Sequence, residues 1–455
     1  MHETSLAPAP AAEPTRAFSA EPATTPAAQD AGPASGPERP SLWRSRNFLL
    51  LWTGQTVGEL GAQISAVAVP LLAATVLQAT VFQISLLTFL AWLPYLLFSL
   101  PAGVIADRVD QRRLMIWCDL GRMALMGSLP VVAVVSDLRL WHLYTAVGLT
   151  GVLTVLFNVA YKSKLPRMVE AHQLVDGNAK LSMSKDFAEL IGPTLSGVLI
   201  GLIGATRTFL GNGLAFLISA VTLFLIKEPA GSGPVEEKDA DRAPLRVQMT
   251  EGLAFIREQP ILRKILACTT TSNFFVMAAG SIEVTFMVRE LHAPSWMVGL
   301  VFSVSAIGGL TVGALTQRIS RRVGTARIIW VSMAVPGPLY LLMPLAQPGW
   351  GVLLYGLGLA AFSANAVLYN VAATSYQQSI TPTRLLGRVN ASFLWICYGA
   401  IPLGALTGGL LASLLGLRTA LLICVLGTWS AALFVYFSPL RSLRDMPETA
   451  PGNRG

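Results

Sequence analysis

Three polar residues spaced four apart interrupt the first long apolar run of the sequence: Gln55, Glu59 and Gln63. Residues four apart share one face of a helix, so they form a polar stripe. A charge at the centre of a membrane helix costs on the order of 2.5–3.5 kcal/mol on insertion scales, and such residues mark ion or substrate pathways. We therefore predict that Glu59 is a protonatable carboxylate facing a central path; the alternative is a protonated glutamic acid bonded to a neighbouring helix.

A second group of charges lies within one helical turn, at Lys185, Asp186 and Glu189. Lys185 and Glu189 have the spacing of a helical ion pair, which would leave Asp186 less compensated. Asp186 and Glu189 join Glu59 as candidates for proton coupling, and a structural salt bridge is the alternative.

Neutral and acidic residues in other apolar runs are candidates for a substrate path. These are Asn158, Asn273, Glu283 and Asn370, together with Gln55 and Gln63. Hydrogen bonding between helices is the alternative for the two asparagines Asn158 and Asn370. Asp119 and Arg122, spaced three apart, are predicted to brace a gate rather than to touch substrate.

The elements that must position these residues are membrane-spanning helices. Hydrophobic residues make up 53% of the chain and charged residues 13%. The apolar residues fall in runs of about twenty, the length that crosses roughly 30 Å of hydrocarbon. We predict an all-α membrane protein with spans near 47–77, 80–104, 114–135, 140–161, 178–203, 206–226, 262–288, 295–317, 325–346, 350–373, 388–414 and 417–437.

Orientation follows from the basic residues, which are concentrated in alternate connections. They are Arg44 and Arg46; Arg108, Arg112 and Arg113; Lys162, Lys164 and Arg167; Arg318, Arg321 and Arg322; Arg384 and Arg388; and Arg441 and Arg444. Positive loops remain on the cytoplasmic side, so both termini are predicted to lie inside the cell. The net charge of +8 is thus explained by basic residues that orient the helices and contact anionic lipid headgroups, so we predict no nucleic-acid partner.

The polar segments divide the chain further. Residues 1–41, rich in Ala, Pro, Ser and Thr, and residues 439–455 are predicted to be cytoplasmic tails, the first of them disordered. Residues 227–261 are predicted to be a cytoplasmic linker between six-helix halves at 42–226 and 262–438. Within this linker, apolar residues at Leu245, Met249, Leu253 and Ile256 predict an amphipathic helix on the membrane surface.

The two halves share sequence at one offset. Residues 155–160 read VLFNVA and residues 367–372 read VLYNVA, 212 residues later. At the same offset Asn178-Ala179 recurs as Asn390-Ala391, and Gly192 recurs as Gly404. Three matches at one offset indicate an internal duplication.

Residues 103–113, GVIADRVDQRR, place a glycine, an acid and an arginine cluster in what we predict to be a short loop between two spans. The segment resembles the signature of the major facilitator superfamily, filled here by Gly103, Asp107, Arg108, Arg112 and Arg113. A weaker copy around Arg318 has glutamine in place of the acid. The resemblance implies two pseudo-symmetric six-helix halves, a substrate path between them and alternating access. It also implies a gating role for these residues beside Asp119 and Arg122.

The segment Gly192-Pro193, with Gly197 and Gly201, is similar to an abbreviated form of the motif found in exporters of this superfamily. One feature departs from the proton antiporters: residues 140–161 contain no arginine. Over residues 42–438 the chain resembles the branch of siderophore, macrolide and multidrug exporters. We expect a monomeric exporter of small amphipathic or lipophilic molecules in the cell membrane, driven by protons. The alternatives are a nutrient importer or uniporter, and a membrane receptor without transport.

Enzymatic and metal chemistry is not indicated. The sequence has no phosphate-binding loop and no His-Glu-x-x-His pattern, and its four cysteines show no paired spacing. We therefore predict no catalytic residues, no cofactor and no metal site.

Overall fold

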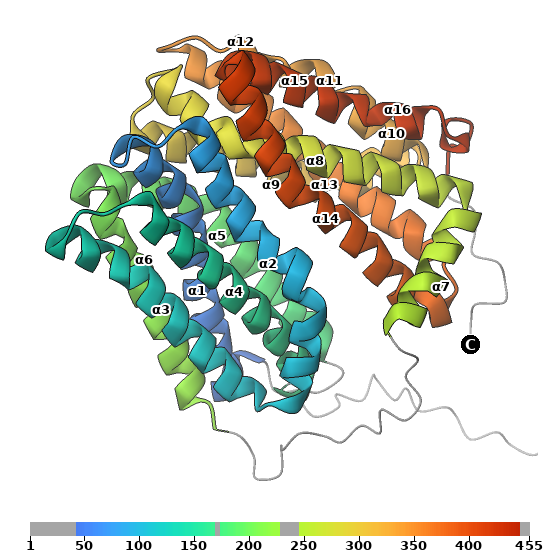
Figure 1. Ribbon diagram of the computed structural model, residues 1–455. Helices are drawn as coiled ribbons and strands as arrows, with labels where there is room; N and C mark the ends of the chain where they lie inside the picture. The colour runs from blue at the N-terminus through green and yellow to red at the C-terminus, as the bar shows by residue number, and fades with distance from the viewer. Residues whose placement is uncertain (1–41, 169–172, 228–244, 446–455) are drawn as a thin grey trace, which may run out of the picture. The chain divides into compact units, whose positions relative to one another are not determined.

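A computed structural model describes residues 42–168, 173–227 and 245–445, and within them the regular elements are all helices (Figure 1). The elements of the N-terminal set are α1 (Arg46–Thr75), α2 (Val81–Arg108), α3 (Gln111–Val135), α4 (Leu140–Met168), α5 (Leu174–Ile203) and α6 (Ala205–Leu225). Those of the C-terminal set are α8 (Pro260–Arg289), α9 (Ser295–Val323), α10 (Arg327–Ala334), α11 (Gly337–Tyr340), α12 (Leu342–Leu345), α13 (Gly351–Ile380), α14 (Leu386–Leu415), α15 (Leu417–Ser430) and α16 (Ala432–Tyr436). Helix α7 (Leu245–Glu258) precedes the second set, and short 3-10 turns occupy Leu42–Arg44, Thr383–Leu385 and Pro439–Arg441.

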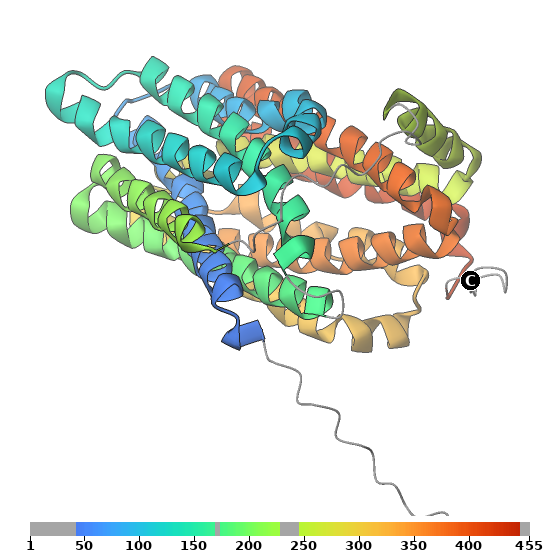
Figure 2. The same cartoon turned by 90° about the horizontal axis from the view of Figure 1, so that it is seen from below.

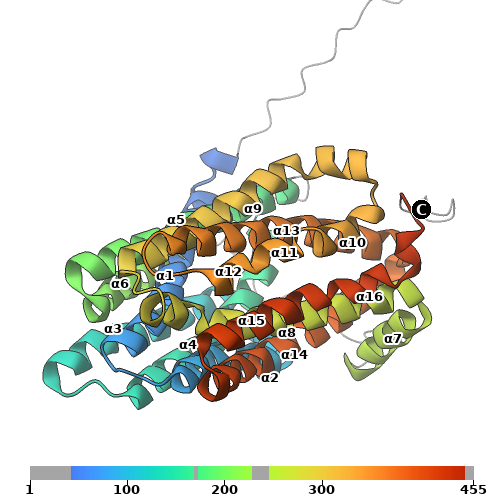
Figure 3. The ribbon, with the colours of Figure 1, turned by 90° about the horizontal axis from the view of Figure 1, so that it is seen from above.

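Twelve segments of the described chain are long and apolar enough to cross a membrane, which confirms the predicted fold class. In the N-terminal set α1 packs on α5 and α6, and α4 packs on α2 and α3. In the C-terminal set α8 packs on α14 and α15, and α13 packs on α9 and α10. The two sets meet where α5 lies against α9 and α2 lies against α14 (Figure 3).

The duplication is visible in how the helices approach one another. A Cβ atom on Gly192 of α5 would lie 2.4 Å from the Cβ of Gln63 on α1, and one on Gly404 of α14 would lie 2.2 Å from the Phe274 carbonyl on α8. Such distances leave room only for hydrogen at both positions. The pairs α5–α1 and α14–α8 are therefore equivalent in the two sets.

Equivalent glycines also shape the contact between the sets and the turns beyond it. Gly197 of α5 abuts the backbone at Ser295 of α9, and its counterpart Gly409 of α14 abuts Ser85 of α2. The turns that follow these helices use Gly204 and Gly416, with φ of 85° and 84°. Backbone in this left-handed region favours glycine, because a side chain would clash.

The predicted loop at residues 103–113 is wrong in its extent. Helix α2 continues to Arg108 and α3 begins at Gln111, so only Val109 and Asp110 connect them. The Asp110 carboxylate accepts a hydrogen bond from the Arg113 backbone N–H at 3.1 Å and caps α3. Charges indicate where the hydrocarbon ends, whereas a helix continues until a capping residue stops it.

The ninth and twelfth predicted spans are not continuous helices. The ninth is divided into α10, α11 and α12. The first break lies at the segment Pro336-Gly337-Pro338, where the prolines lack a backbone donor, and the second lies at Leu341. The twelfth is divided into α15 and α16 at Ala431. Gly337 lies directly on the ring of Trp429, whose Nε1 donates to the Ala334 carbonyl at 3.0 Å, so the two breaks pack together.

Helix α7 forms within the segment where an amphipathic helix is predicted, beside α14 and α8 (Figure 2). Gly252 meets the Arg388 carbonyl of α14, Glu251 pairs with Arg388, and Ile256 is buried in an apolar cluster with Leu262. The side chains of Leu245 and Met249 lie outside the described residues. One side of α7 thus contacts protein.

Candidate functional site

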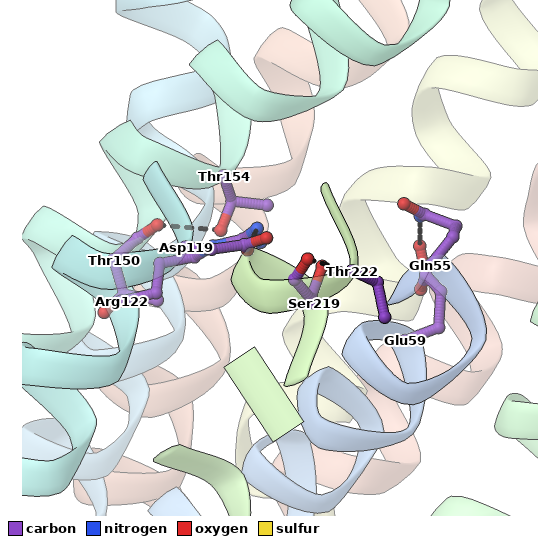
Figure 4. A network of polar contacts seen from close by, with 8 residues as sticks. All are labelled: Gln55, Glu59, Asp119, Arg122, Thr150, Thr154, Ser219 and Thr222. Atoms are coloured by element: carbon purple, nitrogen blue, oxygen red, sulfur yellow. Dashed lines mark hydrogen bonds and ion pairs between the residues drawn. The ribbon is translucent and has the colours of Figure 1, made fainter. Parts of the chain in front are cut away.

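The polar stripe of α1 lies beside α5 and α6, with its three side chains half-buried. The Gln55 Nε2 donates to Glu59 Oε1 at 2.9 Å (Figure 4). Gln63 packs instead against Gly192 of α5. The Glu59 carboxyl is therefore partnered by a neutral amide rather than by a cation in direct contact.

Two charged residues of α5 accompany Glu59. Lys185 Nζ lies 3.5 Å from Glu189 Oε1, which confirms the pair expected from their spacing, and both side chains are exposed. Lys185, Glu189 and Arg122 are all within electrostatic range of Glu59. Asp186 is also exposed on α5. The predicted coupling residues thus come from two adjacent helices, α1 and α5.

Asp119 and Arg122 form an ion pair inside the N-terminal set, where their exposed fractions are 0% and 6%. The Arg122 guanidinium lies 4.3 Å from the ring centroid of Phe157 on α4 and 4.6 Å from that of Phe216 on α6. Figure 4 shows Ser219 and Thr222 of α6 between this pair and Glu59. The pair therefore joins α3, α4 and α6.

The predicted gating residues have separate partners where the structure describes them. Arg112 Nε donates to the Leu223 carbonyl at 2.9 Å, and its guanidinium also bonds the Phe224 carbonyl. A cation at these carbonyls stabilises the C-terminal end of α6. Arg113 lies 3.6 Å from Asp110, and Arg318 is exposed near the end of α9. The side-chain environments of Gly103, Asp107 and Arg108 lie outside the described residues.

The two duplicated asparagines differ in environment. Asn158 Nδ2 donates to the Tyr95 hydroxyl of α2 at 3.1 Å, whereas Asn370 is exposed. The ring centroid of Trp92 lies 5.2 Å from that of Tyr95 and 6.5 Å from that of Tyr398 on α14. These aromatic rings bring α2 and α14, and thus the two sets, together.

The two remaining candidates lie on α8. Asn273 and Glu59 are both the fourteenth residue of 30-residue helices, α8 and α1, so they occupy equivalent places in the two sets. Asn273 is half-buried. Glu283 lies farther along α8 and is partly buried, and its Oε1 is shielded from solvent without a hydrogen-bond partner among the described residues. The structure thus does not bring Glu283 into contact with the Glu59 stripe.

The chain matches the family of transmembrane secretion effectors in the major facilitator superfamily over residues 40–453. It belongs to this family. The MFS-type transporter YfiS of Bacillus subtilis is 28% identical over 85% of this chain and 92% of its own length. Macrolide efflux protein A of Streptococcus pyogenes is 22% identical over 85% of this chain and 96% of its own length.

Solved structures support the same fold. A bacterial homologue of the human lysosomal transporter Spinster, in an inward-facing and unoccupied conformation, has a TM-score of 0.69 and 16% sequence identity. The match covers 88% of this chain and 97% of that one. The chain is therefore a multi-pass membrane transporter of the major facilitator superfamily and not an enzyme. Within the described residues, no group of three potential ligands lies close enough to hold a metal ion.

Several polar residues of this transporter were missed by sequence reasoning. Asn212 of α6 is fully buried and donates to the Gly61 carbonyl and to Ser65 Oγ of α1. Asn365 of α13 is buried and donates to Met333 Sδ at 3.5 Å. A lone asparagine in an apolar run was the signal for both.

Proposed function

We propose that this transporter exports small amphipathic or lipophilic molecules by proton antiport, through alternating access of its two sets. The observation that supports it most is the half-buried Glu59, held mid-span by a neutral glutamine with Lys185 and Glu189 nearby. A carboxyl in this setting can gain or lose a proton without breaking an ion pair of its own. Export is supported by the similarity to macrolide efflux protein A over nearly the whole chain.

The state of the structure fits one step of such a cycle. Ser85 of α2 bonds Ser281 of α8 at 3.3 Å, and Thr194 of α5 bonds Ser303 of α9 at 2.6 Å. Arg289 of α8 also donates to the Ala79 carbonyl. We call the end of the sets that carries these bonds the joined end. The opposite end carries Arg46, where α1 begins, and Arg441, which follows α16.

Basic residues are concentrated at the end away from the joined end. By the positive-inside rule, we infer that this end and both termini face the cytoplasm, with the transporter in the cell membrane. The sets are then closed to the outside and represent the inward-facing state of a monomer. In this orientation Asp107, Arg108 and Arg318 lie at the cytoplasmic end, where they gate the path when the sets exchange positions. Halves 42–226 and 262–438 move as units about linker 227–261.

Aromatic side chains supply the substrate surface. Trp92, Tyr95 and Tyr398 come from both sets, and Asn158 donates a hydrogen bond to Tyr95 within this group of rings. Pockets for small organic molecules are lined by apolar and aromatic groups with a few polar ones that fix orientation. Asn273, at the place on α8 that matches Glu59 on α1, contributes a neutral polar group from the other side.

The test is transport of erythromycin and of ethidium into inverted membrane vesicles that contain the protein. We expect accumulation that depends on the proton gradient, stops with uncoupler and is lost in Glu59→Gln. Glu258→Gln, the same change at an exposed position at the end of α7, is the matched control and should transport normally. Gradient-driven accumulation at the wild-type level in Glu59→Gln would remove Glu59 from coupling, and uptake in the opposite direction would indicate an importer.

A further inference from the structure

The chain segment that follows α16 crosses the start of α10. The backbone N–H groups of Ala326 and Arg327 donate to the Arg444 carbonyl at 3.1 and 3.2 Å. The Asp445 carboxylate accepts hydrogen bonds from the Thr325 backbone N–H at 3.1 Å and from the Thr325 hydroxyl at 3.3 Å. This segment is therefore fixed on the first turn of α10.

The N-terminal set connects the same two elements through an arginine side chain. Its third span is α3, and Arg112 of α3 donates to two carbonyls at the end of α6. The neighbouring Arg113 pairs with Asp110. In the C-terminal set, backbone N–H groups at the start of α10 and the Asp445 carboxylate make the corresponding connection. The arginine side chains near α10 are therefore not needed for it.

Arginines are concentrated around this connection. Residues 315–345 and 431–445 contain one acid, Asp445, and six arginines: Arg318, Arg321, Arg322, Arg327, Arg441 and Arg444. Asp445 bonds Thr325 and lies 4.0 Å from Arg444. Arg327 and Arg441 are exposed, and neither forms an ion pair with a described residue. The protein itself thus leaves this positive charge without a counterion.

Aromatic rings adjoin these arginines where α10 and α16 lie side by side (Figure 1). The Arg441 guanidinium lies 4.5 Å from the ring centroid of Tyr436. That centroid lies 5.6 Å from the ring of Trp330 on α10 and 5.3 Å from the ring of Phe437. Trp330 follows Arg327 by one helical turn, and Phe437 is 70% exposed. Tryptophan and tyrosine are enriched where spans leave the hydrocarbon, so we place this surface at the level of the lipid headgroups.

We propose that Arg327 and Arg441 bind the phosphate of an anionic phospholipid, whose acyl chain lies on the exposed ring of Phe437. Guanidinium groups bind phosphate oxygens through paired N–H donors, and a phospholipid supplies both the negative charge and the apolar part. In the N-terminal set Arg112 also lies near an exposed ring, 5.9 Å from that of Phe224, but its Nε and one terminal nitrogen donate to carbonyls. Lipid binding at α10 requires neither a particular substrate nor proton coupling.

The first test titrates the whole protein in detergent with dioleoylphosphatidylglycerol and counts bound lipids by native mass spectrometry. We expect Arg327→Gln with Arg441→Gln to weaken binding of the first lipid roughly thirtyfold, because two contacts with the phosphate are lost. Arg327→Lys with Arg441→Lys retains the charge and should bind more tightly than the glutamine variant.

The matched control is Arg139→Gln with Arg207→Gln, which removes the same charge from exposed positions in the α3–α4 connection and at the start of α6. It should bind phosphatidylglycerol as the wild type does. Equal affinity of the control and of Arg327→Gln with Arg441→Gln would overturn the proposal.

The same titration identifies the chemistry of the ligand. Dioleoylphosphatidylcholine has the same chains without net charge and should bind more weakly than phosphatidylglycerol. Glycerol 3-phosphate has the phosphate without the chains and should not displace the lipid. Equal binding of phosphatidylcholine would contradict recognition of charge, and displacement by glycerol 3-phosphate would indicate a site for a soluble anion instead of a lipid.

The second test locates the lipid in nanodiscs, with a phosphatidylglycerol that carries a photoreactive diazirine near the start of one acyl chain. We expect cross-links to be concentrated in the peptide that contains Phe437, and to be reduced in Arg327→Gln with Arg441→Gln. Cross-links spread evenly over the ends of all spans would contradict a defined site. Because the wild-type protein is mapped, this measurement decides the question even where a variant is unstable.

Discussion

At the residue scale, the ion pair of Asp119 and Arg122 shows how charge is accommodated inside one set. Asp119→Ala leaves the Arg122 guanidinium between two aromatic rings without its carboxylate partner. Removing one member of a buried pair costs about 3–5 kcal/mol, and we expect a loss of this size in the free energy of unfolding. Arg122→Met should cost a similar amount, because it leaves a buried carboxylate.

The control for this prediction is the double variant Asp119→Ala with Arg122→Met, which removes both charges and combines the substitutions of the two single variants. It should be more stable than either single variant, because neither charge is left unpaired. Thermal unfolding of the four proteins in one detergent gives the coupling between the two residues. Additive losses would show that the pair does not stabilise the packing of α3 against α4 and α6.

At the element scale, close helix approach is controlled by single glycines. Gly404→Ala would place a Cβ atom 2.2 Å from the Phe274 carbonyl, which is backbone and cannot rotate away. We expect α14 to be displaced from α8, with a loss of about 1–3 kcal/mol in the free energy of unfolding, as for other overpacked sites. Thermal unfolding measures this loss. Gly387→Ala on the same helix is the matched control, since nothing lies within 4 Å of a Cβ atom at that position. Equal stability of the two variants would contradict the close approach.

The same scale shows what could be predicted from the sequence. Apolar run length gave the number of spans, and the Gly192 and Gly404 repeat predicted an equivalence that the structure shows as contacts with α1 and α8. Helix rotation cannot be obtained from one sequence, so Tyr95 was not predicted as the hydrogen-bond partner of Asn158. The break at Pro336-Gly337-Pro338 was predictable, because two prolines in one turn remove backbone donors. It was not predicted because the hydropathy of this segment is that of an uninterrupted span.

At the scale of the whole molecule, alternating access requires the joined end to separate in every cycle. The Ser85 and Ser281 hydroxyl oxygens are 3.3 Å apart and belong to opposite sets. In a protein whose four cysteines are replaced, Ser85→Cys with Ser281→Cys should therefore cross-link on oxidation. We expect the cross-link to stop erythromycin transport in vesicles and reduction to restore it, while each single cysteine variant is unaffected. Continued transport by the cross-linked protein would mean that the joined end does not open, and that substrate crosses without the exchange of two states on which the antiport proposal depends.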